Sequence, residues 1–273
     1  MIRKRASRAA AVALPLAAVA LAALTFGPGQ SASAQESRAA KPTVVLVHGA
    51  WADSSSWNEV IPRLRDDGYP VVAVSNPLRS LAGDAAYVKT FLATVKGPIV
   101  LVGHSYGGAV ITNAATGNKN IKSLVYVNAF APDQGESPVQ LAGPDSALSA
   151  DPATIFSFVP ATLPPTAATD LYLNRSAVFN SFATGLNDRQ KELVLATQRP
   201  AAFGGLNEKS GVPAWKTIKS SYLIGTTDKI IPASAQRAMA KRAGSTVTEY
   251  DGGHLGLMTD ARTIVRGIEK AAQ

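Results

Sequence analysis

The stretch Ile99-Val-Leu-Val-Gly-His-Ser-Tyr-Gly-Gly-Ala109 decides the fold. Its apolar start, Ile99–Val102, predicts a buried strand, and the residues after the serine are typical of a helix. A glycine two places before and two places after the serine permits a turn that larger side chains would block. The pattern therefore predicts a nucleophile elbow. The hydroxyl of Ser105 is exposed at the turn, and the backbone N–H of Tyr106 begins the helix, where it can stabilise a developing negative charge.

The histidines point to a base for this serine. A serine alcohol is a weak nucleophile until a neighbouring base takes its proton, and histidine is the usual base near neutral pH. The chain has three histidines. His104 is adjacent to Ser105, so we expect its side chain to point away from the hydroxyl, and His48 ends another apolar run as a loop-shaping residue. His254, late in the chain on a glycine-rich loop, is the expected base. In folds that carry a nucleophile elbow, the catalytic residues follow one another along the chain as nucleophile, acid and base.

The acid that orients His254 has two candidates on chemistry alone. A carboxylate must hold the imidazole in the right tautomer, so it should lie just past the end of a strand near the histidine. Asp228 follows a predicted strand and fits this requirement. Asp133 follows the preceding strand and stays open as the alternative.

Composition excludes several other classes of protein. With 273 residues, 46% hydrophobic and 17% charged, the chain has ample length for one large core, and one domain is the simpler interpretation. Cysteine is absent, which excludes disulfides, thiolate metal sites and a cysteine nucleophile. The three histidines are scattered along the chain, so we expect no metal and no cofactor.

The N-terminal region predicts a secretory signal peptide over residues 1–34. A basic start precedes the apolar run Ala9–Phe26, and Ala32-Ser33-Ala34 forms a small-residue cleavage site before Gln35. The chain is therefore expected to be secreted, with no stable membrane association after cleavage; an uncleaved membrane anchor is the alternative. Removing four basic and no acidic residues lowers the formal net charge from +8 to +4. A net charge of +4 that is spread along the chain does not favour nucleic acid as a partner.

The remaining residues, 35–273, alternate apolar strands with helices. Strands rich in valine, isoleucine and leucine between helices predict an α/β fold with a mostly parallel sheet covered on both faces. The expected strands are Thr43–Val47, Val71–Val74, Ile99–Val102, Ser123–Asn128, Ser221–Ile224 and Thr246–Tyr250. The expected helices are a capping-box helix opened by Ser56 and Glu59 and ending at Asp67, then Asp84–Val95, Gly108–Ala115, Ala233–Arg242 and a last helix from Asp260.

This alternation breaks between Ala131 and Trp215. The segment contains a proline-rich run at 159–165 and two runs with a helical pattern, Thr169–Ala183 and Asn187–Thr197, without a convincing strand. An apolar insertion between two sheet strands predicts a helical cap over the mouth of the active site, residues 131–215. Its aromatic side chains form either the cap's own small core or contacts with substrate.

The chain after residue 34 resembles the α/β-hydrolase superfamily. Within it, the sequence is similar to the group of plant methyl-ester esterases, hydroxynitrile lyases and their bacterial secreted esterase relatives. The motifs that carry this resemblance are His48-Gly49-Ala50 with Trp57, Gly103-His104-Ser105-Tyr106-Gly107-Gly108, Pro213-Ala-Trp-Lys-Thr-Ile218, Asp228-Lys-Ile-Ile-Pro232 with Gln236, and Gly253-His254.

The resemblance implies a function for five residues. Carried over by position, Ser105 is the nucleophile, His254 the base and Asp228 the acid, and the backbone N–H groups of Ala50 and Tyr106 form the oxyanion hole. The implied activity is hydrolysis of a small-molecule carboxylic ester through an acyl-enzyme. An aspartate nucleophile, as in dehalogenases of this fold, is disfavoured because position 105 is serine.

Two other functions stay open. One is a non-catalytic, ligand-binding protein that keeps the fold as a receptor. The other is a hydroxynitrile lyase. In such lyases a threonine matches Gly49 and a lysine follows the catalytic histidine, whereas this chain has Gly49 and Leu255. The sequence identifies neither the ester nor the oligomeric state.

Overall fold

The computed structural model describes residues 40–273, which form one compact unit. The signal peptide predicted for residues 1–34 lies outside the described residues, as does its cleavage site. Among residues 40–273, no helix combines the length and the apolar character needed to cross a membrane.

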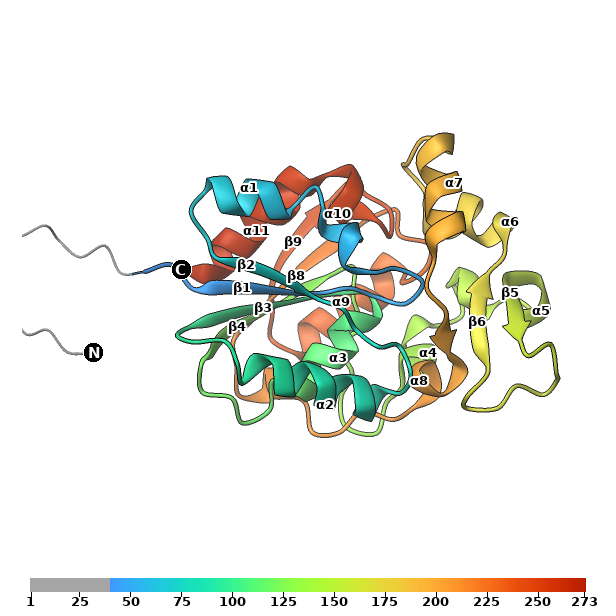
Figure 1. Ribbon diagram of the computed structural model, residues 1–273, viewed down its shortest axis with the longest axis horizontal. Helices are drawn as coiled ribbons and strands as arrows, with labels where there is room; N and C mark the ends of the chain where they lie inside the picture. The colour runs from blue at the N-terminus through green and yellow to red at the C-terminus, as the bar shows by residue number, and fades with distance from the viewer. Residues whose placement is uncertain (1–39) are drawn as a thin grey trace, which may run out of the picture. The chain divides into compact units, whose positions relative to one another are not determined.

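A six-stranded sheet forms the centre of the fold (Figure 1). All its pairings are parallel. Strands β1 (Thr43–Val47) and β3 (Ile99–His104) lie inside the sheet and are buried along nearly their whole length, which explains their continuous runs of branched apolar residues. The predicted parallel sheet is confirmed. In spatial order, its strands are β2 (Val71–Val74), β1 (Thr43–Val47), β3 (Ile99–His104), β4 (Ile121–Val127), β8 (Ser220–Gly225) and β9 (Thr246–Tyr250).

Helices cover both faces of this sheet. In Figure 1, α1 and α11 lie above the strands, and α2 and α3 lie below them, joined on that side by α9, which contacts β8. This arrangement leaves the carboxyl ends of the strands open at one edge, where loops converge in an open α/β sheet. The helices of this layer are η1 (Ser54–Trp57), α1 (Ile61–Asp66), α2 (Leu81–Leu92), α3 (Tyr106–Ala114), α9 (Ala233–Arg242), α10 (Gly256–Thr259) and α11 (Ala261–Ala272).

The capping-box helix predicted from Ser56 is wrong. The side chain of Asp53 accepts a hydrogen bond from the N–H of Ser55 and opens the short 3₁₀ turn η1 instead. The α-helix begins only at Ile61, next to a proline, which has no N–H to donate and therefore suits a first helical turn.

Two other helices begin earlier than the sequence predicts. The hydroxyl of Ser80 caps α2 by accepting from the N–H of Gly83, so this helix begins at Leu81 and not at Asp84. Helix α3 begins at Tyr106, directly after Ser105, as the elbow requires and two residues before the helical run expected from Gly108. The last helix, predicted from Asp260, is confirmed: it begins at Ala261, and the side chain of Asp260 caps it by accepting from the N–H of Thr263.

Residues 131–215 contain a second sheet, which corrects the prediction of an all-helical insertion. Strands β5 (Phe156–Val159), β6 (Asp170–Leu173) and β7 (Ala201–Ala202) pair antiparallel. The run Thr169–Ala183, predicted to be helical, therefore begins with strand β6 and becomes helical only from Arg175. Leu171 and Leu173 are buried while their neighbours are partly exposed, the period of two that a half-buried strand requires.

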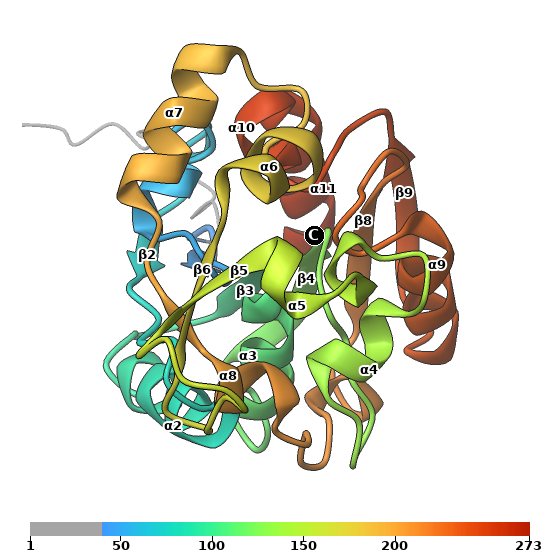
Figure 2. The same ribbon diagram turned by 90° about the vertical axis from the view of Figure 1, so that its right-hand side faces the viewer.

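This insertion lies beyond the carboxyl ends of the main sheet. Figure 1 places its elements past the strand ends, and Figure 2 shows them facing the viewer across that edge. The other elements between β4 and β8 are α4 (Pro138–Ala142), η2 (Ala147–Ser149), α5 (Pro152–Ile155), α6 (Arg175–Ala177), the π-helical turn η3 (Val178–Phe182), α7 (Asp188–Thr197), α8 (Phe203–Asn207) and η4 (Ala214–Lys216).

Candidate active site

Ser105 lies at a strained turn between β3 and α3. Its φ of +53° and ψ of −125° fall in a region that non-glycine residues rarely adopt. The turn closes because the flanking glycines have no side chains: a Cβ on Gly103 would lie 2.6 Å from the carbonyl oxygen of Gly107, and a Cβ on Gly107 would lie 2.5 Å from that of Val47. The elbow predicted from the sequence is therefore present.

The structure brings Ser105, His254 and Asp228 together in a line. The Oγ of Ser105 lies 2.9 Å from Nε2 of His254, and Nδ1 of the same ring lies 2.9 Å from Oδ2 of Asp228. An ionised carboxylate only accepts hydrogen bonds, so Nδ1 carries the proton and Nε2 presents a lone pair to the serine hydroxyl. The imidazole is thus poised to accept the proton of Ser105.

Four further donors surround the carboxylate of Asp228. The backbone N–H groups of Ile230 and Ile231 donate to Oδ1 at 2.8 and 3.0 Å. The side-chain amides of Asn128 and Gln236 donate to Oδ2 at 3.0 and 3.1 Å. A buried carboxylate is stable as an anion only when such donors replace water, so these groups hold the charge that faces His254.

Asn128 was not singled out from the sequence as a site residue. It directly follows β4 with a positive φ of 45°, and its Nδ2 also donates to the carbonyl oxygen of Gly253, in the loop that carries His254. The signal that could have identified it is its place as the polar residue that ends an apolar strand at the carboxyl edge of a parallel sheet.

The alternative acid, Asp133, lies elsewhere. Its Oδ1 is 2.6 Å from Nζ of Lys216, and about a third of its side chain is exposed. The hydrogen bond from Lys216 is the main reason that the pKa of Asp133 is lowered. Its partner is therefore a lysine and not His254.

The other two histidines are buried and support loops at the site. His104 points away from the hydroxyl of Ser105, as expected, and its Nε2 lies 2.9 Å from the backbone oxygen of His254. Burial lowers the pKa of His104 well below its ordinary value. The ring is therefore neutral, and its Nε2–H donates to the loop that carries the base.

His48 shapes the loop that follows β1. Its Nδ1 lies 2.9 Å from the backbone oxygen of Gly49, and its Nε2 accepts a hydrogen bond from the N–H of Asn76 at 2.9 Å. Burial lowers the pKa of His48 to about 4, so the ring stays neutral and can fill both roles. These bonds fix the backbone next to Ala50.

The N–H groups of Ala50 and Tyr106 are free to bind an oxyanion. Within residues 40–273, neither donates a hydrogen bond to another group. Both residues line the small space beside Ser105. The hydroxyl of Tyr106 donates to Oδ2 of Asp84 at 2.9 Å, which anchors the first residue of α3 through its side chain. Burial raises the pKa of Asp84.

The space beside Ser105 is small and apolar. Its volume is about 10 Å³, close to the minimum for a single water molecule. Trp51 and Phe130 form walls from the core, and Val139, Leu148 and Leu206 close it from the insertion. A substrate therefore needs these side chains to move aside.

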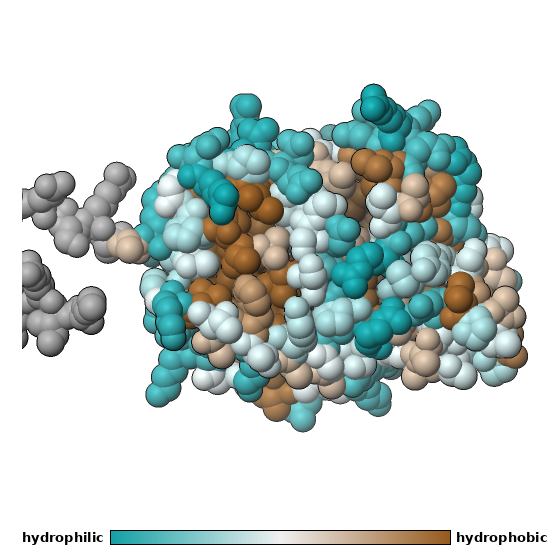
Figure 3. All heavy atoms as spheres, in the orientation of Figure 1, coloured by the Kyte–Doolittle hydropathy of each residue, from teal (hydrophilic) through white to brown (hydrophobic). Residues whose placement is uncertain are grey.

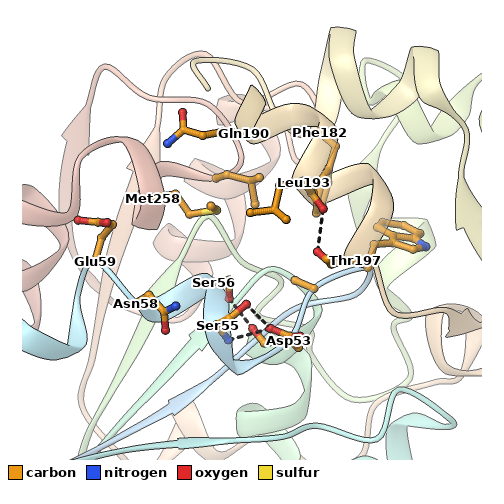
Figure 4. A pocket seen from close by; sticks show the side chains of 14 residues that line it. Asp53, Ser55, Ser56, Asn58, Glu59, Phe182, Gln190, Leu193, Thr197 and Met258 are labelled. Atoms are coloured by element: carbon orange, nitrogen blue, oxygen red, sulfur yellow. Dashed lines mark hydrogen bonds between the residues drawn. The ribbon is translucent and has the colours of Figure 1, made fainter. Parts of the chain in front are cut away.

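A second pocket of about 230 Å³ lies between η1 and α7 (Figure 4). Asp53 and Ser55 stand on one side of it, and Leu193 and Phe182 on the other. The indole of Trp51 lines both this pocket and the space beside Ser105. Ser105 is absent from its walls, so this pocket is not the reaction site itself.

Across residues 40–273, no three side chains of histidine, cysteine, aspartate or glutamate lie close enough together to hold an ion. The polar centre of the site is instead the line Ser105, His254 and Asp228.

Comparison with protein families gives one match across the fold. A model described as the Alpha/beta hydrolase family matches residues 44–266, from β1 into α11.

Two curated relatives match part of the chain. A carbendazim hydrolyzing esterase of Nocardioides sp. (strain SG-4G) is 36% identical over 110 residues, 36% of this chain and 46% of the relative. An alpha-hydroxynitrile lyase of Arabidopsis thaliana is 33% identical over 108 residues, 34% of this chain and 42% of the relative. The matched stretches thus cover less than half the length of either relative.

Solved structures that are similar over nearly their whole length include the following example. It is an extracellular alpha/beta-hydrolase from a Paenibacillus species, described as sharing homology with tobacco salicylic acid binding protein 2. The two chains superpose with a TM-score of 0.72 at 22% identity, over 84% of this chain and 98% of the other. This likeness shows the fold, and the family match together with the curated esterase and lyase confirms the resemblance seen in the sequence.

Proposed function

This chain belongs to the alpha/beta hydrolase family, and we propose that it is a serine esterase that hydrolyses carboxylic esters through an acyl-enzyme. The observation that carries the proposal is the pair of 2.9 Å contacts that join Ser105 to His254 and His254 to Asp228. Acyl transfer requires a serine hydroxyl next to a base and N–H donors that stabilise the oxyanion. Ser105 beside His254 meets the first requirement, and the N–H groups of Ala50 and Tyr106 meet the second.

In the first half of the reaction, Ser105 attacks the ester carbonyl. His254 takes the proton from Oγ through Nε2 as the new C–O bond forms. The carbonyl oxygen becomes negatively charged and lies between the N–H groups of Ala50 and Tyr106. As the tetrahedral intermediate collapses, the C–O bond to the alcohol breaks, and the imidazolium gives its proton to the leaving oxygen.

In the second half, water replaces the alcohol. His254 takes a proton from water, the hydroxide attacks the acyl carbon, and the bond to Ser105 breaks with return of the proton to Oγ. Asp228 stabilises the imidazolium in both halves without taking its proton. The donors around its carboxylate support this role because they keep it ionised.

The proposal is tested by turnover of p-nitrophenyl acetate by the wild-type protein and by Ser105→Ala. We expect turnover by the wild type and a loss of roughly a millionfold in kcat in the variant, with folding unchanged. A folded wild-type protein without esterase activity would favour the non-catalytic receptor.

We further propose that the protein is secreted, because residues 1–34 have the layout of a signal peptide. Mass spectrometry of the protein exported by an expressing bacterium is expected to find an N-terminus at or near Gln35. An intact Met1 in the membrane fraction would indicate an anchor.

A further inference from the structure

An apolar cavity of about 490 Å³ lies within the insertion. Its walls come from α5, β5, β6, α8 and the proline-rich loop after β5, and its lining includes Phe156, Phe158, Leu163, Leu171 and Phe203. A cavity of this size suits a drug-sized group. An apolar lining favours a hydrocarbon ligand, because binding removes the apolar surfaces of both ligand and lining from water, which is favourable in free energy.

This cavity adjoins the space beside Ser105. Val139, Leu148 and Leu206 line both, so these three side chains form the partition between them. Val139 is 45% exposed, which gives it room to move, and it stands on the five-residue helix α4. The partition is thus made of side chains, and moving them aside would join the cavity to the space beside Ser105.

The position of His254 indicates which part of an ester would take this route. The leaving alcohol must face Nε2 of His254, because this atom returns the proton. The ring of Phe182 lies 5.3 Å from that of His254, and both Phe182 and Leu255 line the other pocket, across Trp51. Phe182 thus lies beside the ring of His254, whereas the partition closes the space beside Ser105 on the side of the insertion, which leaves that side for the acyl group.

We propose that the apolar cavity is the binding site for the acyl group and that the substrates are esters of uncharged acids with a bulky hydrocarbon chain or ring. This inference rests on the proposed esterase function. Trp51 holds the boundary between the two sides of the ester, since its Nε1 donates to the backbone oxygen of Leu171 at 3.0 Å and its ring stacks on Phe156.

The lining of the cavity favours an uncharged acyl group over an anionic one. Asp151 and Asn207 are the polar side chains in its lining. Asp151 accepts a hydrogen bond from the N–H of Ala153, which keeps its carboxylate at the wall. An anionic acyl group would lose its hydration among hydrocarbon side chains and meet this like charge, whereas a hydrocarbon chain meets neither cost.

The test compares p-nitrophenyl esters that share one leaving group and differ in the acid. We expect kcat/KM to rise by up to about fourfold for each added methylene from acetate to hexanoate. The hemisuccinate ester, which matches the hexanoate in heavy atoms but carries a carboxylate, should be at least about a hundredfold poorer than the hexanoate. A flat series, or equal turnover of the hemisuccinate, would overturn the proposal.

A variant of the partition tests the route. Val139→Phe narrows the passage, so the ratio of hexanoate to acetate kcat/KM should fall by on the order of tenfold. Val247→Phe on β9 is the matched control, because Val247 is equally exposed at 44% and lies outside both cavities; its ratio should equal that of the wild type.

The outcomes separate this inference from the esterase proposal. An unchanged ratio in Val139→Phe, with acetate still hydrolysed by the wild type, would refute the acyl site and leave the esterase standing. If the folded wild type hydrolyses none of these esters and a fluorophosphonate does not label Ser105, the proposed function itself fails.

Discussion

The side chain of His104 is bound to the backbone of His254: its Nε2 lies 2.9 Å from the carbonyl oxygen of that residue, across 150 positions of sequence. The two rings are 4.8 Å apart. The residue before the nucleophile therefore holds the loop that carries the base, and a side-chain hydrogen bond links the elbow to the histidine loop.

Removing this bond should lower activity without removing the nucleophile. In His104→Ala the carbonyl oxygen of His254 loses its buried donor, and an error of about 1 Å in the base can cost on the order of a hundredfold in kcat. His104→Gln, which can restore an N–H donor, should recover part of the loss. Steady-state kinetics with p-nitrophenyl acetate measures both, and equal kcat in His104→Ala and wild type would show that the contact does not position the base.

The two candidate acids predict opposite outcomes for a matched pair of variants. Asp228→Asn should lower kcat by roughly ten thousandfold, because a neutral amide at this position favours the wrong tautomer of His254. Asp133→Asn should change kcat by less than about threefold, since it breaks only a partly exposed ion pair with Lys216. The reverse order of losses would assign the acid to Asp133.

The stability of the protein should fall in mild acid because of His48. Burial lowers its pKa to about 4 in the folded state, against an ordinary value of 6.5. The unfolded chain therefore binds the proton first, so the stabilisation is complete above pH 6.5 and is lost as the pH falls toward 4. Between pH 7.5 and pH 5, this group alone should remove about 2 kcal/mol from the free energy of unfolding.

Urea unfolding at the two pH values measures this loss. The variant His48→Gln, whose amide does not titrate, should lose correspondingly less stability than the wild type over the same interval. The lowered pKa of His104 acts in the same direction and is present in both proteins. Equal losses in variant and wild type would show that His48 does not titrate in this range.

Cyanohydrins should be poor substrates. The space beside Ser105 has an apolar lining, and Leu255, which follows His254, lines the other pocket. A departing cyanide would therefore lack the lysine that follows the histidine in the lyases, and an anion that loses such a partner in a water-poor site costs several kcal/mol. Incubation with mandelonitrile should release little cyanide, whereas p-nitrophenyl acetate should be cleaved. Rapid cyanide release that requires Ser105, without ester turnover, would establish a lyase.

The main sheet was predictable because most of its strands contain continuous apolar runs, which need no knowledge of distant contacts. The elbow was equally clear, since the glycines on both sides of Ser105 form a local motif after an apolar run, although the crowding that requires Gly107 comes from Val47 on β1. The second sheet was not predictable, because β7 has only two residues and its pairing with β6 depends on residues some thirty positions apart.

The supporting residues of the site were hidden for a related reason. Asn128 is the last residue of a predicted strand, and nothing in its neighbours reveals that Asp228 lies 3.0 Å away. The link between His104 and His254 likewise joins residues that only the folded sheet brings together. Motifs identified the reacting groups, whereas the contacts that hold them arise from tertiary packing.

The central claim is that Ser105 is a nucleophile activated by His254, and labelling by a fluorophosphonate tests it most directly. Mass spectrometry of the treated wild-type protein should find one adduct per chain, on the peptide that contains Ser105, and none in Ser105→Ala. His254→Ala should label far more slowly than the wild type. A folded wild-type protein without an adduct at Ser105 would contradict the account.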